Sequence, residues 1–558
     1  MPRSFLAVLA LHLGCSCAGP PPVVEREDGD RRPLAVECDP IDPIRCLLPW
    51  PSNAFAETDP ASATGLRLKV DPSSMNPRDD ATSLAAADGF SRVTPIATAF
   101  EAPLDPATLE AAVHLVLAQH DHAARGRSVP LRVDTVSNES GETLLVASPR
   151  EVLEASADYV AIVTDELRFA DGSAPVAPRS VRVALGLELP ATEEEAELAG
   201  HHAPTRRLLE RIGIAPERVL RVWEFTTRSP DDPRRALRHV REASVAAVQS
   251  ATVTFDEVEI PTDRPHVALI VHGHLHGIPT FLTPEERNFV LDDEGLPIPQ
   301  GTTDVPFRVL VPAGAGDYRF VMYGHGTGGH ERDAAFDDRL AEIGVAKVNV
   351  RFYGWTENDV ALTFARMREV FAGSAGAAAS LVEALAHAAA IQRAMSGVLA
   401  DALAADTIGG RPNPAAGRRP DTSIPIWVGG SLGGTCGLVY AALEPEVRYA
   451  VLNVPGAAWA QWIRLSSVFR YVRLLVPDRL YTDLDLALAL AIAQTNLDMA
   501  DGAAWSDVLA REPAALLIQE SMGDPVMPNR ATEMVAVAAG ARHVGGVLEP
   551  ILGVEPAD

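Results

Sequence analysis

The sequence predicts a two-part protein, with an all-β N-terminal domain followed by an α/β domain that has a mostly parallel sheet. Residues 34–190 contain short apolar runs separated by Pro, Gly, Asp and Asn, which is typical of a β-sandwich. After residue 255, strand patterns alternate with helical patterns of ten residues or more, which indicates βαβ units. A length of 558 residues also exceeds that of one ordinary domain.

Composition and charge exclude several classes of protein. The chain is 47% hydrophobic and 22% charged, as expected for a folded globular protein, and its formal net charge is -27. Because such a surface repels phosphate backbones, we expect no nucleic-acid partner. We expect a small-molecule or lipid partner instead, and contact with a membrane only through an N-terminal lipid anchor.

The N-terminus resembles an export signal, which we assign to residues 1–19. Arg3 precedes an apolar run at 5–14, which is too short to span a bilayer. Cys15 follows Gly14, as at a lipoprotein cleavage site, although His12 stands where such sites usually carry Leu. We therefore expect export, either as an outer-membrane or periplasmic lipoprotein lipidated on Cys15 or as a secreted protein.

Three cysteines remain in the mature chain. Cys38 and Cys46 lie close together in a proline-rich stretch, and an oxidising compartment favours a disulfide between them over two buried thiols. Cys436 is predicted to be a packed helix residue.

The predicted N-terminal domain spans residues 34–230 and contains a helical insert at 193–213. A further helix is expected at about 231–249. The domain's predicted strands are 113–118, 144–148, 159–164, 181–187 and a closing strand at 223–229.

The predicted α/β domain spans residues 255–558. A long Ala-rich helix is expected at 380–395, and a mainly helical insertion at about 458–510 stands where a cap would cover a site. Its predicted strands lie within 319–329, 345–355, 424–434, 447–456 and 514–524.

The strongest chemical signal is Gly429-Gly430-Ser431-Leu432-Gly433, which stands between an apolar strand pattern and a helix of small residues. Glycines at this spacing permit a sharp strand-to-helix turn that exposes the serine hydroxyl. The sequence therefore predicts Ser431 as a nucleophile, with a purely structural glycine turn as the alternative.

A second glycine-rich turn, His325-Gly326-Thr327-Gly328-Gly329, ends an earlier strand. An oxyanion hole needs one N–H group from such a loop and one from the residue after the nucleophile. We expect donors at Thr327 (or Gly326) and Leu432, and we expect His325 to brace the loop.

The acid and the base should follow the serine in the chain. Asp524, just past the strand pattern at 514–524, is the predicted acid, with Glu520 as the alternative. His543 is the only histidine after Asp524, but it opens a predicted strand at 542–550. That strand would hold it roughly 20 Å from the serine, so we expect a surface position instead.

His272, His274 and His276 alternate and would share one face of a strand. Three imidazoles could bind a divalent metal, but no Asp follows at the spacing of metallohydrolases. We therefore predict a polar strand face, with no metal and no cofactor.

With these residues assigned, the chain resembles the bacterial virulence-factor-type lipases, which are surface lipoproteins of the α/β-hydrolase superfamily. The resemblance covers nearly the whole chain and rests on the segments 46–55, 87–96, 157–173, 277–282 and 325–329 together with the two motifs around Ser431 and Asp524. It implies an Ig-like N-terminal domain, a capped α/β-hydrolase domain, Ser431 as nucleophile and Asp524 as acid.

The resemblance has one departure, at the C-terminal end. Such lipases continue well past the acid and carry the catalytic histidine there, whereas this chain stops at Asp558. We therefore expect a C-terminus that is truncated relative to that pattern.

The predicted function is that of a serine esterase or lipase acting at the cell envelope through an acyl-enzyme on Ser431. The alternative is a non-catalytic envelope lipoprotein, a degenerate hydrolase that binds a ligand or partner in the same pocket.

Overall fold

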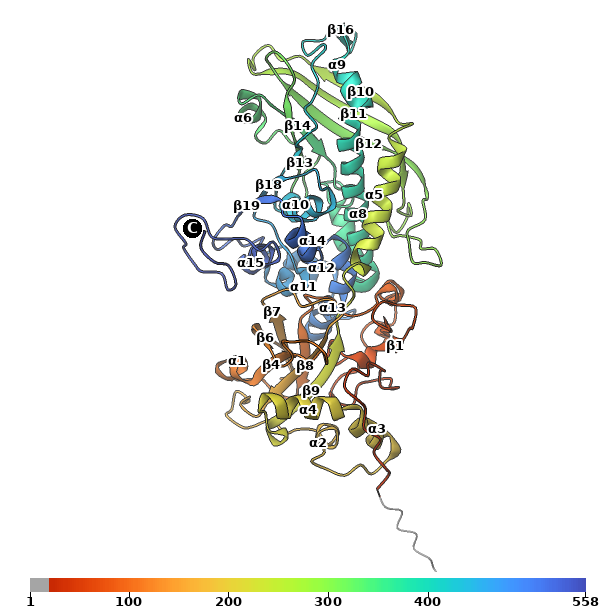
Figure 1. Ribbon diagram of the computed structural model, residues 1–558, viewed down its shortest axis with the longest axis vertical. Coiled ribbons are helices and arrows are strands. Elements are labelled where there is room, and N and C mark those ends of the chain that lie inside the picture. Colours follow the sequence, from red (N-terminus) through yellow and green to blue (C-terminus); the bar gives the residue numbers. More distant parts are fainter. Residues whose placement is uncertain (1–19, 558) are drawn as a thin grey trace, which may run out of the picture.

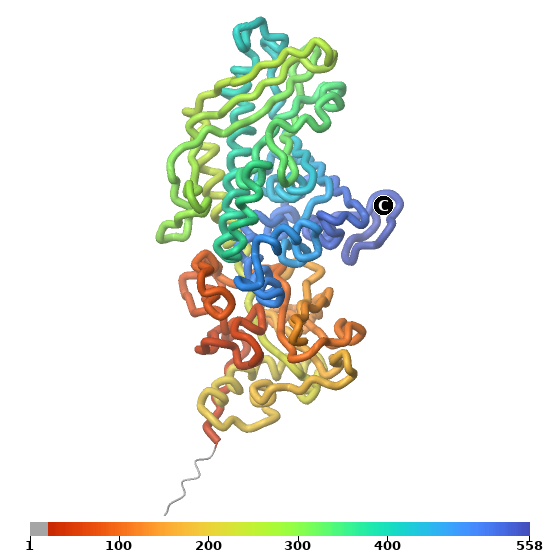
Figure 2. The backbone as a smooth tube through the Cα atoms, turned by 180° about the vertical axis from the view of Figure 1, so that it is seen from behind, coloured from red at the N-terminus to blue at the C-terminus, as the bar shows by residue number. Residues whose placement is uncertain are grey.

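The computed structural model describes residues 20–557. The predicted signal peptide and Cys15 lie outside the described residues. Figures 1 and 2 show an elongated molecule in which the N-terminal β domain lies at one end and the large sheet at the other, with helices of the 458–510 insertion between them.

Seven strands of the N-terminal domain form two antiparallel sheets. Leu144 of one sheet and Tyr159 of the other belong to the same apolar core. One sheet has the order β3 (Ile96–Phe100), β7 (Thr143–Pro149), β6 (Leu131–Ser137), and the other has the order β5 (Ser128–Val129), β4 (Val113–Leu117), β8 (Asp158–Thr164), β9 (Val219–Thr226).

Smaller elements complete this domain. Cys38 and Cys46 form a disulfide, with their Cα atoms 4.8 Å apart. The remaining elements are β1 (Ala56–Thr58), β2 (Leu66–Leu68) and α1 (Leu109–Ala112), and the insert consists of α2 (Arg179–Ala184), α3 (Glu193–His201) and α4 (Ala203–Ile212).

The strand predicted at 181–187 is wrong, because Arg179–Ala184 forms helix α2. The N–H groups of Arg182 and Leu185 donate to the carbonyl oxygens of Pro178 and Val181, four residues earlier, which is the pattern of an α-helix and not of a strand. Gly186, with φ of 75°, ends the helix.

The large sheet has eight strands, and its central and C-terminal part is parallel. Strands β14, β13, β17, β18 and β19 run in parallel, which confirms the predicted parallel sheet, whereas β10, β11 and β12 join antiparallel at the other edge. The order is β10 (Thr252–Glu259), β11 (Val267–Thr280), β12 (Gly301–Pro312), β14 (Val345–Val350), β13 (Arg319–Gly324), β17 (Ile426–Gly430), β18 (Tyr449–Asn453), β19 (Ala515–Gln519).

Helices cover both faces of this sheet. Leu269 and Val271 pack in the core that includes α8 (Val370–Ala394), whereas Ile270, which points to the opposite face of β11, packs against Ala341 of α6 (Asp337–Glu342). The helices are α5 (Arg235–Ala247), α6 (Asp337–Glu342), α7 (Val360–Arg366), α8 (Val370–Ala394), α9 (Val398–Ala404) and α10 (Leu432–Leu443), with a small hairpin of β15 (Thr407–Ile408) and β16 (Arg411–Pro412).

Helix α8 begins ten residues before the predicted helix at 380–395. Within the described residues it is the one helix long and apolar enough to cross a membrane, but its apolar window is 100% buried in the protein. The length and hydropathy of α8 are therefore those of a core helix.

The insertion forms a cap of short helices and one long helix. A capping box between Thr482 and Asp485 starts the long helix α13. The cap comprises α11 (Trp459–Trp462), α12 (Phe469–Leu475), α13 (Asp483–Leu497) and α14 (Ser506–Arg511).

The strand predicted at 542–550 is also wrong. After α15 (Asn529–Ala538) the chain makes a loop beside the sheet, and only an isolated bridge joins His543 to Pro556. Gly545, with φ of 79°, turns the chain, and the side chains of Val544 and Leu548 are more than four-fifths exposed. These residues have no neighbouring strand to pair with.

Candidate active site

Ser431 lies in a strained turn between β17 and α10. Its φ and ψ are 53° and −118°, a conformation that few non-glycine residues adopt and that costs about 1–3 kcal/mol. Its N–H donates to the Asn453 carbonyl oxygen at 2.8 Å, which ties the turn to the end of β18. The serine is thereby fixed at the carboxyl end of the parallel strands.

Two glycines of this motif allow the turn to close. A Cβ on Gly429 would lie 2.3 Å from the Gly433 carbonyl oxygen, and one on Gly433 would lie 1.9 Å from the Gly324 carbonyl oxygen. No side chain fits at either position. Gly430 differs, because its nearest neighbour, the Asn453 side chain, would be 3.7 Å away.

The loop after β13 lies against this turn. A Cβ on Gly326 would be 3.6 Å from the Cβ of Ser431. The N–H groups of Gly328 and Gly329 are used, because they donate to the carbonyl oxygens of Trp355 and Gly326. Within residues 20–557 the Thr327 N–H has no acceptor, and Leu432, the first residue of α10, has no acceptor within its helix.

His325 holds the loop in position. Its Nδ1–H donates to the Gly326 carbonyl oxygen at 2.7 Å, and its Nε2 accepts from the Phe352 N–H at 3.0 Å. Burial lowers the pKa of this imidazole, so the neutral ring is favoured. Both nitrogens are used within the protein, which is the bracing role expected of His325.

A pocket of about 100 Å³ is lined by Thr327, Ser431 and Leu432 together with side chains of the cap. The Trp459 ring lies 5.8 Å from that of Trp355 and 5.3 Å from that of Trp462. The other lining residues are mostly apolar: Thr363, Phe364, Met367, Ser374, Ala377, Ala460, Ile463, Ser466, Val468, Val472, Leu490, Leu497, Val526 and Met527.

Most polar groups that line the pocket already make hydrogen bonds within the protein. The hydroxyls of Thr363, Ser374 and Ser466 each donate to a backbone carbonyl oxygen. The Trp462 indole N–H donates to the Ala457 carbonyl oxygen at 3.0 Å. A bound molecule therefore meets an apolar surface, apart from the groups around Ser431.

Asp524 lies in the loop after β19, at the same edge of the sheet as Ser431. Its carboxylate accepts from the N–H groups of Val526 and Met527, at 2.8 and 3.0 Å, and both residues line the pocket. Glu520 accepts from the Asn529 side chain at 2.7 Å, and burial raises the pKa of its carboxyl group.

No histidine is among the pocket-lining residues of the described chain. His543 is held within the C-terminal loop, where its Nε2 accepts from the Ile551 N–H at 3.2 Å and its N–H donates to the Glu555 carbonyl oxygen. The structure thus brings together Ser431, the 325–329 loop and the loop of Asp524, but His543 does not line the pocket.

The alternating histidines lie on β11, and none of them lines the pocket of Ser431. His274 pairs with Asp256 and His276 with Asp304, each at 2.7 Å. His272 lies near Glu257 and Glu259 of β10.

The sequence analysis missed the tryptophans of the pocket. Trp459 and Trp462 stand three residues apart in the predicted cap, a spacing that puts both on one side of a helical turn. That spacing is the sequence feature that could have predicted a shared position for the two tryptophans. The convergence of Trp355 from a different segment follows only from the tertiary structure.

Comparisons with known proteins give structural neighbours only. No protein-family model and no curated protein sequence matches the chain. An acetyl xylan esterase from a Thermoanaerobacterium species is 14% identical, with a TM-score of 0.36, and the match covers 55% of this chain and 85% of that one.

Two further neighbours are also esterases. An acetyl xylan esterase from a Paenibacillus species is 14% identical, with a TM-score of 0.32 over 55% of this chain and 85% of that one. A glucuronoyl esterase from Teredinibacter turnerae is 12% identical, with a TM-score of 0.29 over 52% and 66%. TM-scores this low establish no shared fold, so any functional assignment depends on the geometry of this chain.

Proposed function

We propose that the chain is a serine carboxylic-ester hydrolase of the α/β-hydrolase type, with Ser431 as its nucleophile. The observation that carries the proposal is the strained turn at Ser431, which faces a glycine-rich loop and an apolar pocket. Strained backbone at the carboxyl ends of parallel strands is a feature of nucleophile turns.

In the proposed reaction the Ser431 hydroxyl oxygen attacks the ester carbonyl carbon. The negative charge that develops on the carbonyl oxygen is stabilised by the N–H groups of Thr327 and Leu432. Collapse of the tetrahedral intermediate breaks the bond to the alkoxy oxygen, which leaves as the alcohol with the proton that Ser431 gives up through solvent water, and an acyl-enzyme remains on Ser431. Water then releases the acid and restores the hydroxyl.

No general base has been located at this site among the described residues. Asp524 is proposed as the acid that would orient a histidine, but no histidine of residues 20–557 lines the pocket. A serine hydroxyl without an adjacent general base is a weak nucleophile near neutral pH, so acylation of Ser431 should be slow. We therefore expect slow turnover, which is best measured with activated esters.

The substrate proposed for this site has a small apolar acyl group. An engineered cavity of about 150 Å³ holds benzene, and the pocket beside Ser431 is smaller, at about 100 Å³. The lining hydroxyls of Thr363, Ser374 and Ser466 already donate within the protein, so sugar hydroxyls would find few partners there.

Hydrolysis of p-nitrophenyl butyrate by the full chain tests the proposal. Ser431→Ala should abolish turnover because it removes the attacking oxygen. Ser396→Ala, at an exposed serine beyond α8, should leave turnover unchanged. Equal turnover by the wild type and Ser431→Ala would refute the assignment of Ser431.

Among the described residues no histidine lines the pocket, which favours a second candidate, a non-catalytic protein that binds an apolar ligand in the same pocket. This candidate predicts no turnover with any ester. It also predicts that ligands quench tryptophan fluorescence equally in the wild type and Ser431→Ala.

The cellular location is a proposal from sequence alone. We propose export through the signal at residues 1–19, anchoring at the cell envelope through a lipid on Cys15, and an Ig-like character for the N-terminal sheets. Metabolic labelling with a palmitate analogue measures the anchoring, and Cys15→Ser should prevent the labelling.

A further inference from the structure

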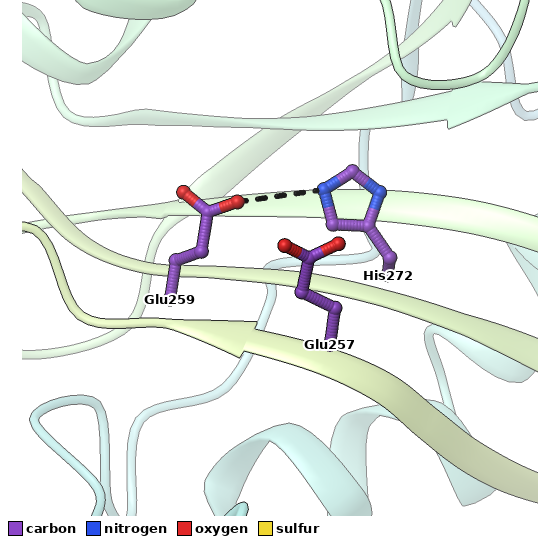
Figure 3. Close-up of side chains that lie close together, drawn as sticks. All are labelled: Glu257, Glu259 and His272. Atoms are coloured by element: carbon purple, nitrogen blue, oxygen red, sulfur yellow. Dashed lines mark ion pairs between the residues drawn. The ribbon is translucent and has the colours of Figure 1, made fainter.

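The edge of the large sheet carries a cluster of three metal-ligating side chains, far from the strand ends that hold Ser431. Glu257 of β10 lies directly opposite His272 of β11, and Glu259 follows two residues later on the same face of β10. One potential ligand atom from each residue lies within 4.8 Å of those of the other two. Figure 3 shows both carboxylates and a ring nitrogen of His272 directed toward one another.

His272 differs from the two other histidines of its strand. His274 and His276 each have a carboxylate partner at 2.7 Å, whereas Nε2 of His272 is 3.9 Å from Glu259, beyond hydrogen-bond distance. The His272 side chain is only 9% exposed, and within the described residues its Nε2, the nitrogen nearest Glu259, makes no hydrogen bond. A buried imidazole without partners is costly unless something binds it.

An ion pair does not account for this arrangement. A separation of 3.9 Å between Nε2 of His272 and the Glu259 carboxylate is too long for a hydrogen bond, whereas a metal ion between the two could bind both the imidazole nitrogen and the carboxylate oxygen.

Two arginines lie near this cluster, and they differ in burial and in how firmly they are held. Arg308 is buried and held by Asp337 on α6, so it cannot move easily. Arg332 is half exposed and contacts one carboxylate oxygen of Glu257 at 2.9 Å. Arg332 is therefore the cation that an incoming metal ion would displace.

We propose that Glu257, Glu259 and His272 bind a divalent cation of the zinc class. One imidazole nitrogen and two carboxylate oxygens form a ligand set that zinc accepts, and water would complete the coordination. Zinc bonds of about 2.0–2.2 Å bring ligand atoms to about 3.4 Å apart. The two glutamates are exposed, so rotation of their side chains closes the remaining distance.

Calorimetric titration of the metal-stripped full chain with zinc chloride tests the proposal. Loss of an outer-shell partner already weakens metal binding by about 10–100-fold, so loss of a ligand should weaken it at least about ten-fold. His272→Ala and Glu259→Gln should both do so. Arg332→Ala should tighten binding, because it removes the competing cation from Glu257.

His276→Ala is the matched control, since His276 alternates on the same strand but already pairs with Asp304. Binding of zinc by this variant should equal that of the wild type. The proposal is overturned if the wild type shows no saturable binding, or if His276→Ala loses the site while His272→Ala keeps it. If His272→Ala unfolds by circular dichroism, the exposed Glu259→Gln and Arg332→Ala variants decide the outcome.

Discussion

At the scale of single residues, the candidate site requires glycine at positions 429 and 433 as well as Ser431, because the backbone there is packed too closely for a side chain. Ser431 lines the pocket because the backbone bends sharply, and the bend brings Gly433 against the end of β13. Backbone packed this closely has no room to relax, so a methyl group at Gly433 must move either the strand or the helix.

Gly433→Ala should therefore lower the free energy of unfolding by more than about 3 kcal/mol, which is large for one methyl group. Chemical denaturation followed by circular dichroism measures this change. Gly430→Ala is the control within the same motif, because its Cβ would meet only ordinary contacts. Similar stabilities of the two variants would contradict the packing described for Gly433.

Sequence reasoning could propose Ser431, the 325–329 loop and Asp524 as candidates because each depends on local backbone requirements that glycine, proline and strand patterns reveal. The base was not identifiable, because the position of a histidine in space depends on the strand that carries it. The strand predicted for His543 does not form in the structure.

At the scale of elements, the cap determines what can reach Ser431. Val472 of α12 and Leu490 of α13 line the pocket, and Trp459 and Trp462 of α11 close another part of its wall. The sequence predicted a helical cap at 458–510 from its apolar pattern. The pocket itself was not predictable, because it arises where three cap helices meet α7 and α8.

The acyl-chain preference should follow from this wall. Among p-nitrophenyl esters, kcat/KM should be highest for acetate and butyrate and should fall for octanoate. Val472→Ala enlarges the pocket and should raise the octanoate-to-butyrate ratio. Val240→Ala, the same change in α5 outside the pocket, should leave that ratio unchanged. A preference for octanoate in the wild type would contradict the proposed pocket.

At the scale of the whole molecule, buried ion pairs connect the N-terminal domain to the cap. Arg228, just after β9, contacts Asp232 at 2.6 Å and Asp498, just after α13, at 3.0 Å. The three side chains are less than a tenth exposed. The domain thus supports the helices that form the pocket.

Asp498→Ala should lower the free energy of unfolding by about 3–5 kcal/mol, because it leaves part of the Arg228 charge buried and uncompensated. Arg218→Ala is the comparison, because its pairs with Asp165 and Glu166 are half exposed and should contribute little to stability. Urea denaturation of both variants measures the difference. Equal losses of unfolding free energy in the two variants would contradict a stabilising role for the Arg228 ion pairs between the N-terminal domain and the cap.

The most direct test of the central claim is covalent labelling of the full chain with a fluorophosphonate, read by intact mass and peptide mapping. A nucleophilic serine beside an oxyanion hole predicts one adduct, located on Ser431 and absent from Ser431→Ala. A folded wild-type chain that acquires no adduct, or acquires it elsewhere, would contradict the account.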